Sequence, residues 1–413
     1  MNSKNSIKIT KSILQGQVRL SGAKNCALKL LTASVLTSET VEILNSPNGL
    51  LDMQVHIKML NQMGKTCVEG DRNLKITENS LNTELLWDER SIRNSLLILG
   101  SLTTRFGNGK VPLPGGCPLG DRKYDLHIML LEQMGAKVWE EDGYLCTRSD
   151  GRLKGCDIHL PIRSTGATEN AILCASLAKG TTTVWNPHIR PEIIDLINML
   201  NKMGAKIKIC GQKCIVIEGV ETLGGVKHRV ISDNMEALTW AIGAVVTQGD
   251  VEILDFPFDH LEVPLVHLRE SGMQFYRGEN SLIVRGGEAY PIDISTGPYP
   301  GINSDMQPLF AVFGATSKGE SRIIDLRFPG RYGYAEELAK MGVKYEIDGR
   351  LLKIHGGNQL QGAKVKALDL RAGIALLLAG MTADGVTEIE DSWQIGRGYE
   401  NLKGKLKGLG VEI

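Results

Sequence analysis

Residues 112–127, PLPGGCPLGDRKYDLH, place a lone cysteine among prolines and glycines, five residues before Arg122. Proline removes a backbone donor and glycine admits conformations closed to other residues, so this stretch cannot be a helix or a regular strand. We expect a shaped loop, and such loops often carry chemistry. Most cysteines are inert core thiols, but a thiol in such a loop beside basic residues is a candidate reactive group. Cys117 is therefore the first candidate.

Charged and polar residues recur where two kinds of predicted helix begin. Buried helices begin near Lys24 and Asn25, Arg93 and Asn94, Thr168 and Glu169, Asp233 and Asn234, Asp305, and Asp369 with Arg371; the other helices begin near Arg122, Arg190, Arg331 and Arg397. Helix N-termini offer free N–H groups and partial positive charge, and arginine adds bidentate donors for carboxylate and phosphate. We expect an anion-binding cleft if two domains turn these ends toward each other. The alternative is that Asp233 and Asp305 are only N-caps.

The elements that must position these residues repeat six times. Segments such as HIKMLNQMGK and LINMLNKMGAKI end on a glycine, and successive glycines are 68 to 71 residues apart; they are Gly64, Gly135, Gly204, Gly272, Gly342 and Gly410. Each segment reads as an amphipathic helix that ends at a glycine and is followed by a strand. The repeat unit is therefore about 70 residues long.

Each repeat also contains a helix that is apolar on most faces, as in GATENAILCASLAKG, and such a helix is normally buried. We predict an α/β fold of α+β repeats, with one buried helix, one half-exposed helix and about four strands in each. Six repeats give two domains of three, residues 22–231 and residues 1–21 plus 232–413. The N-terminal segment SIKITKSILQGQVRL is expected to complete the second domain, whose last repeat should end on a strand at Ile413.

Composition fits an ordinary globular protein of 413 residues, with 42% hydrophobic and 23% charged residues. Lys+Arg and Asp+Glu both number 47, which argues against nucleic acid as a partner. No apolar run has the length of a membrane span, and the N-terminus lacks a signal-peptide core, so we expect a cytoplasmic protein without a membrane partner. The eight cysteines should be reduced. Cys210 and Cys214 lack the additional ligands of a metal site and read as strand cysteines.

The motifs SGAKNCALKLL, LPGGCPLGDRKYDLHI, SDMQ, DLRAG and GRGYE resemble those of the UDP-N-acetylglucosamine 1-carboxyvinyltransferases, over essentially the whole chain. The resemblance implies two inside-out α/β barrel domains and no metal or organic cofactor. It implies transfer of the enolpyruvyl group of phosphoenolpyruvate to the 3-hydroxyl of UDP-N-acetylglucosamine, with release of phosphate, as the first committed step of peptidoglycan precursor synthesis. The expected partners are these small-molecule substrates, and the oligomeric state stays open.

The resemblance also assigns roles to individual residues. Cys117 would protonate the methylene carbon of phosphoenolpyruvate, Asp305 would take the proton of the sugar hydroxyl, and Asp369 would support the reacting centre with Arg371. The expected ligands of phosphoenolpyruvate are Lys24, Asn25, Arg122, Arg397 and Arg371. The expected ligands of the nucleotide sugar are Asn25, Arg93, Arg122, Lys123, Tyr124, Asp125, Leu126, Ile162, Arg163, Ser164, Thr165, Gly166, Asp305, Arg327 and Arg331.

Several positions depart from the family pattern. Leu97 stands where an aromatic residue is expected, Arg190 where an acid is usual, and Arg163 and Arg327 add cations on the nucleotide side. A more cationic pocket would suit an acceptor with a terminal phosphate, such as UMP in nucleoside-antibiotic synthesis. A third alternative is a non-catalytic paralogue that only binds nucleotide. Neutral drift in an enzyme that uses UDP-N-acetylglucosamine is the simplest interpretation, because the motifs of the reacting centre are retained.

Overall fold

The computed structural model describes residues 6–115, 124–328 and 330–413. The chain separates into two compact units, Gly22–Ile231 and Met1–Ser21 with Ser232–Ile413. We call them the 22–231 unit and the 232–413 unit and describe each by itself. Within the described residues, no helix is both long enough and apolar enough to cross a membrane.

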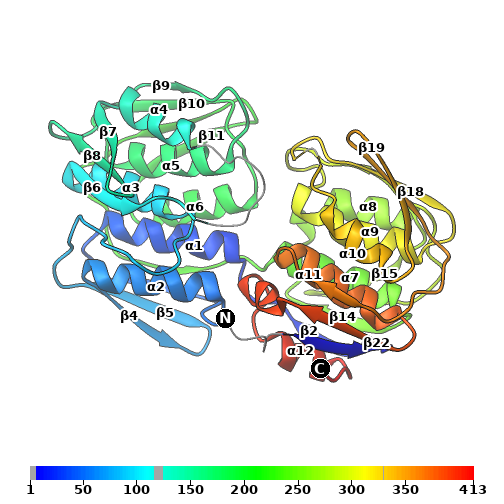
Figure 1. The fold of residues 1–413 in the computed structure, drawn as a ribbon. Coiled ribbons are helices and arrows are strands. Elements are labelled where there is room, and N and C mark those ends of the chain that lie inside the picture. The colour runs from blue at the N-terminus through cyan, green and yellow to red at the C-terminus, as the bar shows by residue number, and fades with distance from the viewer. Residues whose placement is uncertain (1–5, 116–123, 329) are drawn as a thin grey trace. The chain divides into compact units, whose positions relative to one another are not determined.

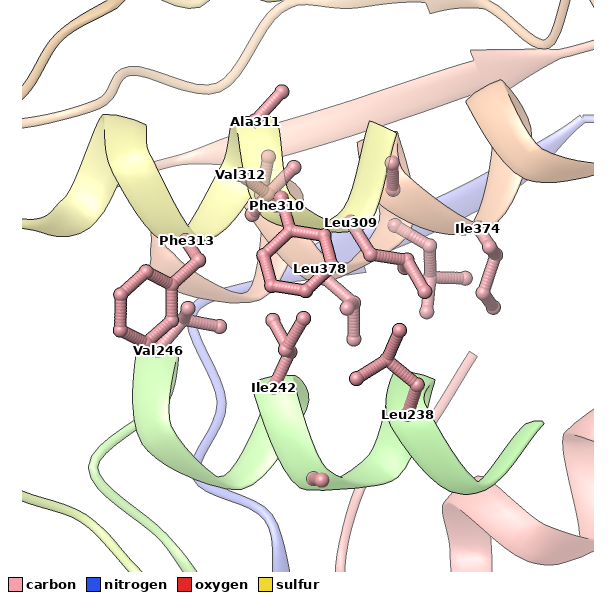
Figure 2. Close-up of a cluster of buried hydrophobic side chains, with 14 of the residues drawn as sticks. Leu238, Ile242, Val246, Leu309, Phe310, Ala311, Val312, Phe313, Ile374 and Leu378 are labelled. Carbon is pink, nitrogen blue, oxygen red and sulfur yellow. The ribbon is translucent and has the colours of Figure 1, made fainter. Parts of the chain in front are cut away.

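Each unit contains three helices that are buried along almost their whole length. They are α1 (Lys24–Ala33), α3 (Ser95–Phe106) and α5 (Thr165–Ser176) in the 22–231 unit, and α7 (Asn234–Val246), α9 (Gln307–Thr316) and α11 (Leu370–Thr382) in the 232–413 unit. Figure 2 shows how Leu238 and Ile242 of α7 face Phe310 of α9 and Leu378 of α11. These helices are apolar on most sides because neighbouring helices and a sheet surround them.

A second helix of each repeat lies partly at the surface. These helices are α2 (Leu51–Met63), α4 (Asp125–Gln133), α6 (Pro191–Lys202), α8 (Glu262–Glu270), α10 (Gly333–Ala339) and α12 (Leu402–Gly408). The six repeat glycines follow these helices with φ between 80° and 106°. A left-handed residue closes the helix and turns the chain into the next strand, and only glycine adopts it without strain. The glycine repeat is thus a repeat of helix ends.

In the part of the chain that the structure describes, six sheets form the outer layer of the units, one sheet for each repeat (Figure 1). In the 22–231 unit the strands are β3 (Val41–Leu44), β4 (Lys65–Gly70), β5 (Asn73–Glu78), β6 (Asn108–Pro112), β7 (Ala136–Glu141), β8 (Tyr144–Ser149), β9 (Asp157–His159), β10 (Thr181–Trp185), β11 (Lys206–Cys210), β12 (Cys214–Glu218) and β13 (Val226–Arg229). In the 232–413 unit they are β1 (Ile7–Thr10), β2 (Gln15–Arg19), β14 (Asp250–Leu254), β15 (Gln274–Arg277), β16 (Ser281–Arg285), β17 (Asp293–Ser295), β18 (Glu320–Ile324), β19 (Lys344–Asp348), β20 (Leu351–His355), β21 (Lys364–Lys366) and β22 (Val386–Glu390). The predicted α/β fold of repeated units is confirmed.

The N-terminal segment forms two strands in two different sheets of the 232–413 unit. β1 pairs antiparallel with β22, and β2 pairs parallel with β14. The expectation of a strand at Ile413 was wrong, because residues 411–413 have no strand assignment. In each of the other sheets the strand after the repeat glycine lies at the edge and pairs with the strand that follows it in sequence; in the last sheet the corresponding partner strand is β1, from the N-terminal segment.

Candidate active site

The predicted site residues fall into two groups, one in each unit, while Cys117, Arg122 and Lys123 lie outside the described residues. The group in the 22–231 unit is Lys24, Asn25, Arg93, Tyr124, Asp125, Leu126, Ile162, Arg163, Ser164, Thr165 and Gly166; the group in the 232–413 unit is Asp305, Arg327, Arg331, Asp369, Arg371 and Arg397. Each group is built on helix N-termini of its own unit.

Lys24 is the first residue of α1 and is held by a carboxylate that sequence reasoning did not find. Its Nζ lies 2.6 Å from Oδ2 of Asp52, whose Oδ1 lies 2.9 Å from Arg90. The side chains of Lys24 and Asp52 are 9% and 6% exposed. Charges this deeply buried persist only when they are paired. Asp52 therefore fixes the Lys24 ammonium at the start of α1, beside the half-buried Asn25.

The N-terminus of α5 packs against a buried histidine. Ser164 caps the helix by accepting a hydrogen bond from the Ala167 amide, and Thr165 Oγ1 lies 2.9 Å from His188 Nδ1. A Cβ on Gly166 would lie 3.3 Å from His127 Nε2, so this close approach favours glycine. Burial, with Arg93 and then Lys29, lowers the pKa of His127 to about 3. The structure thus brings Arg93 and Gly166, at the start of α5, close to a neutral His127.

The other predicted nucleotide residues of this unit lie at its surface. Ile162 is 45% exposed, and the exposed Arg163 donates from Nε to Asn186 Oδ1 at 3.3 Å. Tyr124 precedes α4 and donates its hydroxyl hydrogen bond to Glu140. That carboxylate, with burial, raises the pKa of the Tyr124 phenol. Asp125 is exposed and Leu126 packs partly against the core.

Leu97 belongs to the hydrophobic core of the 22–231 unit. It lies within α3 and is only 2% exposed. A leucine at this position is therefore explained by core packing.

Lys29 of α1 links the N-terminal ends of α3 and α5, and a second ion pair lies at the start of α6. Lys29 Nζ lies 2.7 Å from Asn94 Oδ1 and 3.5 Å from Glu169 Oε2. Arg190, the residue before α6, makes a two-pronged contact with Glu192 at 2.6 and 2.8 Å. Burial first, and then the nearby Glu192, raise the pKa of Glu169 to about 7 against the opposing charge of Lys29. Glu169 was among the charged residues predicted at helix starts, whereas no feature of the sequence singled out Lys29 or Asp52.

Glu169→Gln should gain stability relative to the parent protein as pH rises. The folded state raises the pKa of Glu169 from 4.5 to about 7, so the stability linked to its protonation is fully present below pH 4.5 and is lost as pH rises through 7. Glutamine does not titrate, so the variant does not lose the folding free energy, about 1–3 kcal/mol, that the parent protein loses as pH rises. We expect the difference in melting temperature, variant minus parent, to increase between pH 5 and pH 8 in thermal unfolding scans.

Glu192→Gln is the comparison for this titration. Burial opposes the charge of Glu192, but Arg190 outweighs it and lowers the pKa below 4.5, so Glu192 itself is largely ionised from pH 5 upward. Loss of its charge removes one of the groups that raise the pKa of Glu169, so the melting difference for this variant should rise less between pH 5 and pH 8 than that for Glu169→Gln. A constant difference for Glu169→Gln would show that Glu169 is ionised throughout this range.

In the 232–413 unit, one arginine bridges two predicted catalytic carboxylates. Arg331 lies 2.7 Å from Asp305 Oδ1 and 3.1 Å from Asp369 Oδ2. Burial alone would lower the pKa of Arg331, but the two carboxylates raise it above the ordinary value, so the guanidinium stays charged. The structure thus joins Asp305, Arg331 and Asp369 in one ion-pair network.

Asp233, Asp305 and Asp369 differ in whether their side chains cap a helix. Asp233 is a cap, because its side chain accepts hydrogen bonds from the amides of Met235 and Glu236. The cap interpretation of Asp305 is wrong: the short helix η3 (Ser304–Met306) is capped by Asn303, which accepts a hydrogen bond from the Asp305 amide. Asp305 instead directs its carboxylate to arginines. Asp369 does both, since its Oδ1 caps α11 and its Oδ2 contacts Arg331.

Arg371 is almost completely buried behind Asp305. Its Nε lies 3.6 Å from Asp305 Oδ2, and its Nη1 lies 3.4 Å from the hydroxyl of Tyr399, a residue that sequence reasoning did not assign. Arg397 is 4% exposed at the end of η4 (Ser392–Arg397) and donates to Gln394 Oε1 at 2.9 Å. Since η4 packs against α11, Arg371 and Arg397 lie on neighbouring elements.

Arg327 lies in a loop organised by the buried carboxylate of Asp325. Asp325 Oδ1 accepts hydrogen bonds from the amides of Arg327 and Phe328, and its Oδ2 accepts one from Ser304, the residue before Asp305. The guanidinium of Arg327 lies over the Phe328 ring, 5.3 Å from its centre. The loop that carries Arg327 is thereby tied to the segment that carries Asp305. Across the described residues, no three His, Cys, Asp or Glu side chains gather as metal ligands would.

Comparison with known proteins agrees with this architecture. Residues 9–406 match the family model for EPSP synthase (3-phosphoshikimate 1-carboxyvinyltransferase). The chain is 43% identical to UDP-N-acetylglucosamine 1-carboxyvinyltransferase 2 of Carboxydothermus hydrogenoformans, over 98% of this chain and 97% of that protein. It is 42% identical to the UDP-N-acetylglucosamine 1-carboxyvinyltransferase of Serratia proteamaculans, over 97% and 96% of the two chains.

Solved structures with the same fold include two enolpyruvyl-transferring enzymes. The enolpyruvyl transferase NikO from Streptomyces tendae superposes with a TM-score of 0.88 and 25% identity, over 98% of this chain and 97% of that chain. EPSP synthase from Acinetobacter baumannii gives a TM-score of 0.75 at 17% identity, over 99% and 100%, which shows the shared fold. With a family model matched over almost the whole chain and full-length relatives above 40% identity, the chain belongs to the EPSP synthase family, among the UDP-N-acetylglucosamine 1-carboxyvinyltransferases.

Proposed function

We propose that this protein transfers the enolpyruvyl group of phosphoenolpyruvate to the 3-hydroxyl of UDP-N-acetylglucosamine and releases phosphate. The observation that carries the proposal is the 43% identity, over nearly the whole chain, with a relative named for this activity. The charged helix starts support it, because phosphoenolpyruvate presents a phosphate and a carboxylate that need fixed cations. We place the reaction in the cytoplasm, as the first committed step of peptidoglycan precursor synthesis.

The cations assigned to phosphoenolpyruvate are Lys24, Arg122, Arg371 and Arg397, with Asn25 beside Lys24. Lys24 is held by Asp52 and Arg371 by Tyr399, so neither side chain must be ordered when substrate arrives. A prearranged cation loses little entropy on binding and can stabilise charge where it develops. The nucleotide would bind at the start of α5, through residues 162–166, with Arg93, Lys123 and residues 124–126. Arg327 and Arg331 of the 232–413 unit are also assigned to the nucleotide sugar.

The chemistry requires a proton on carbon and the removal of one from oxygen. Cys117 would protonate the methylene carbon of phosphoenolpyruvate, which makes the neighbouring carbon electrophilic. Asp305 would accept the proton of the 3-hydroxyl as its oxygen attacks that carbon. Loss of the methyl proton and departure of phosphate then restore the double bond. Asp369 would act through Arg331, because its carboxylate contacts the guanidinium that also holds Asp305.

The contacts of the additional arginines favour UDP-N-acetylglucosamine over UMP as the acceptor. Arg190 directs its guanidinium to Glu192, and Arg327 lies over Phe328. Two of the three additional cations therefore have local partners that explain their presence without a terminal phosphate. Only the exposed Arg163, with its single-atom contact to Asn186, points to a more cationic nucleotide pocket.

A side-by-side assay with the two acceptors tests the proposal. Phosphate release from phosphoenolpyruvate should depend on UDP-N-acetylglucosamine and be slow with UMP at the same concentration. The reverse order would establish the paralogue that acts on UMP. Nucleotide binding by calorimetry without phosphate release from either acceptor would establish the non-catalytic alternative.

A further inference from the structure

Two cysteines that the proposed reaction does not use face each other in the 22–231 unit. Cys210 ends β11, Cys214 begins β12, and the two residues are direct partners in this antiparallel pair. Direct partners have Cα atoms about 4.5–5.5 Å apart and side chains on the same face of the sheet. A disulfide needs Cα atoms about 4.4–6.8 Å apart, so the backbone already meets its main requirement. Among the described cysteines, no other two are register partners.

The surroundings of this pair allow a small reagent to reach one of the two thiols. Cys210 is half-buried and Cys214 is 6% exposed, whereas the connecting residues 211–213 are exposed. Burial first, and then the facing Cys210, raise the pKa of the Cys214 thiol. Cys210 is therefore the thiol that a reagent meets first. No third ligand for a metal ion is found near them among the described residues.

We propose that Cys210 and Cys214 form a reversible intramolecular disulfide. The Cys210 thiolate attacks one sulfur of a small-molecule disulfide, forms a mixed disulfide and releases one thiolate. Cys214 then loses its proton and attacks the Cys210 sulfur, which releases the second thiolate. The two cysteines lose two electrons and the reagent is reduced to two thiols. In a reducing compartment the dithiol is the resting state, and the disulfide forms only when the thiol pool is oxidised.

The connecting turn, residues 211–213, contacts Asn186, and Asn186 in turn contacts Arg163 of the predicted nucleotide segment. The backbone amide of Asn186 donates to the carbonyl of Lys213 at 3.3 Å, and Asn186 Oδ1 accepts the hydrogen bond from Arg163. Lys213 also places its ammonium over the Trp185 ring, 5.3 Å from its centre. Closing the disulfide constrains both ends of this turn, so we infer that oxidation shifts Asn186 and with it Arg163. This coupling rests on the proposed function.

Peptide mapping of the native full-length protein tests the disulfide. Trypsin cleaves after Lys208 and Lys213, so residues 209–213 and 214–227 separate unless a disulfide joins them. After treatment with oxidised glutathione, we expect the joined peptides, with the loss of two hydrogen atoms, and their separation by dithiothreitol. Glutathione adducts without joined peptides, an unmodified pair, or joining that occurs only in urea would each overturn the proposal.

Single variants locate the reaction and test its order. Cys214→Ser should stop at a glutathione adduct on Cys210, and Cys67→Ser, which changes another half-buried strand cysteine, should leave the joined peptides unchanged. Joined peptides that disappear in Cys67→Ser would show that Cys67 takes part, against the proposal. If Cys214→Ser fails to fold, peptide mapping of the parent protein still tests whether the disulfide forms.

The coupling is measured by comparing the oxidised and the dithiothreitol-treated enzyme, with Cys210→Ser treated in the same way so that oxidation of Cys117 is separated from the effect of the disulfide. Altering one hydrogen bond to Arg163 should change KM for UDP-N-acetylglucosamine by about two- to tenfold with kcat preserved. Equal KM values, with the joined peptides present, would overturn the coupling while the disulfide stands. A protein that releases no phosphate in either form would contradict the proposed function instead.

Discussion

An Asp305→Asn variant should fold, bind nucleotide and lose turnover by about 10²–10⁴-fold, the usual contribution of a general base. Asparagine keeps the shape of the side chain and an oxygen that can accept hydrogen bonds from Arg331 and Arg371. It cannot take the proton of the attacking hydroxyl. Because Arg331 keeps its contact with Asp369, we expect the free energy of unfolding to fall by only about 1–3 kcal/mol. Single-turnover phosphate release and thermal unfolding measure the two effects.

Asn303→Ala is the matched control, because Asn303 rather than Asp305 caps η3. Loss of the cap should cost about 0.5–2 kcal/mol of stability and leave turnover close to that of the parent enzyme. The two neighbouring changes should therefore separate catalysis from stability. Full turnover in Asp305→Asn would remove Asp305 from the role of base and leave it as a partner of the two arginines.

The fold could be predicted from the sequence because each repeat contains a local signal, a glycine, that marks where a helix ends. Gly64 and Gly204, like the other four repeat glycines, are left-handed residues after helices, and such residues are costly to replace. The buried helices were recognisable because α7 and α9 are apolar on nearly every face, as a helix within a layered unit must be. The strand predicted at Ile413 was wrong because the repeat pattern alone does not show whether the short segment after the last glycine, Gly410, pairs with another strand.

The candidate site could be predicted only in part, because contacts between separate elements are not visible in the sequence. Helix N-termini and arginines gave Lys24, Asp305 and Arg331 from local sequence alone. The partners that local sequence did not reveal come from other elements: Asp52 of α2 contacts Lys24, and Tyr399, just after η4, contacts Arg371. These contacts depend on how separate helices pack, which one sequence does not display. The choice between cap and ion pair at Asp305 also required coordinates, because Asn303 and Asp305 are equally suitable cap residues.

The two units differ in how charged side chains are paired near the starts of their buried helices. In the 22–231 unit, carboxylates such as Asp52 and Glu169 sit behind lysines and hold them in place. In the 232–413 unit, the arginines Arg331 and Arg371 hold the carboxylate of Asp305. The 22–231 unit thus supplies lysines held by carboxylates, and the 232–413 unit supplies buried arginines together with the carboxylate that they orient. Transfer of an anionic group to a hydroxyl needs both fixed cations and an oriented carboxylate.

A Cys117→Ser variant should suppress turnover about as strongly, by about 10²–10⁴-fold, while folding and nucleotide binding stay largely intact. Protonation of a carbon needs an acid whose pKa is near the operating pH, and a serine hydroxyl is a far weaker acid than a thiol. The change replaces sulfur by oxygen and alters neither charge nor backbone, so the melting temperature should hardly move. Phosphate release and calorimetric binding of UDP-N-acetylglucosamine, both at neutral pH, give the two readouts.

Cys156→Ser provides the comparison, because Cys156 is a half-buried thiol to which no role in the reaction is assigned. It should keep full turnover, which shows that loss of a thiol as such does not impair the enzyme. A Cys117→Ser protein that works at the parent rate would show that a different group supplies the proton. The segment of prolines and glycines would then contribute to nucleotide binding rather than supply an acid.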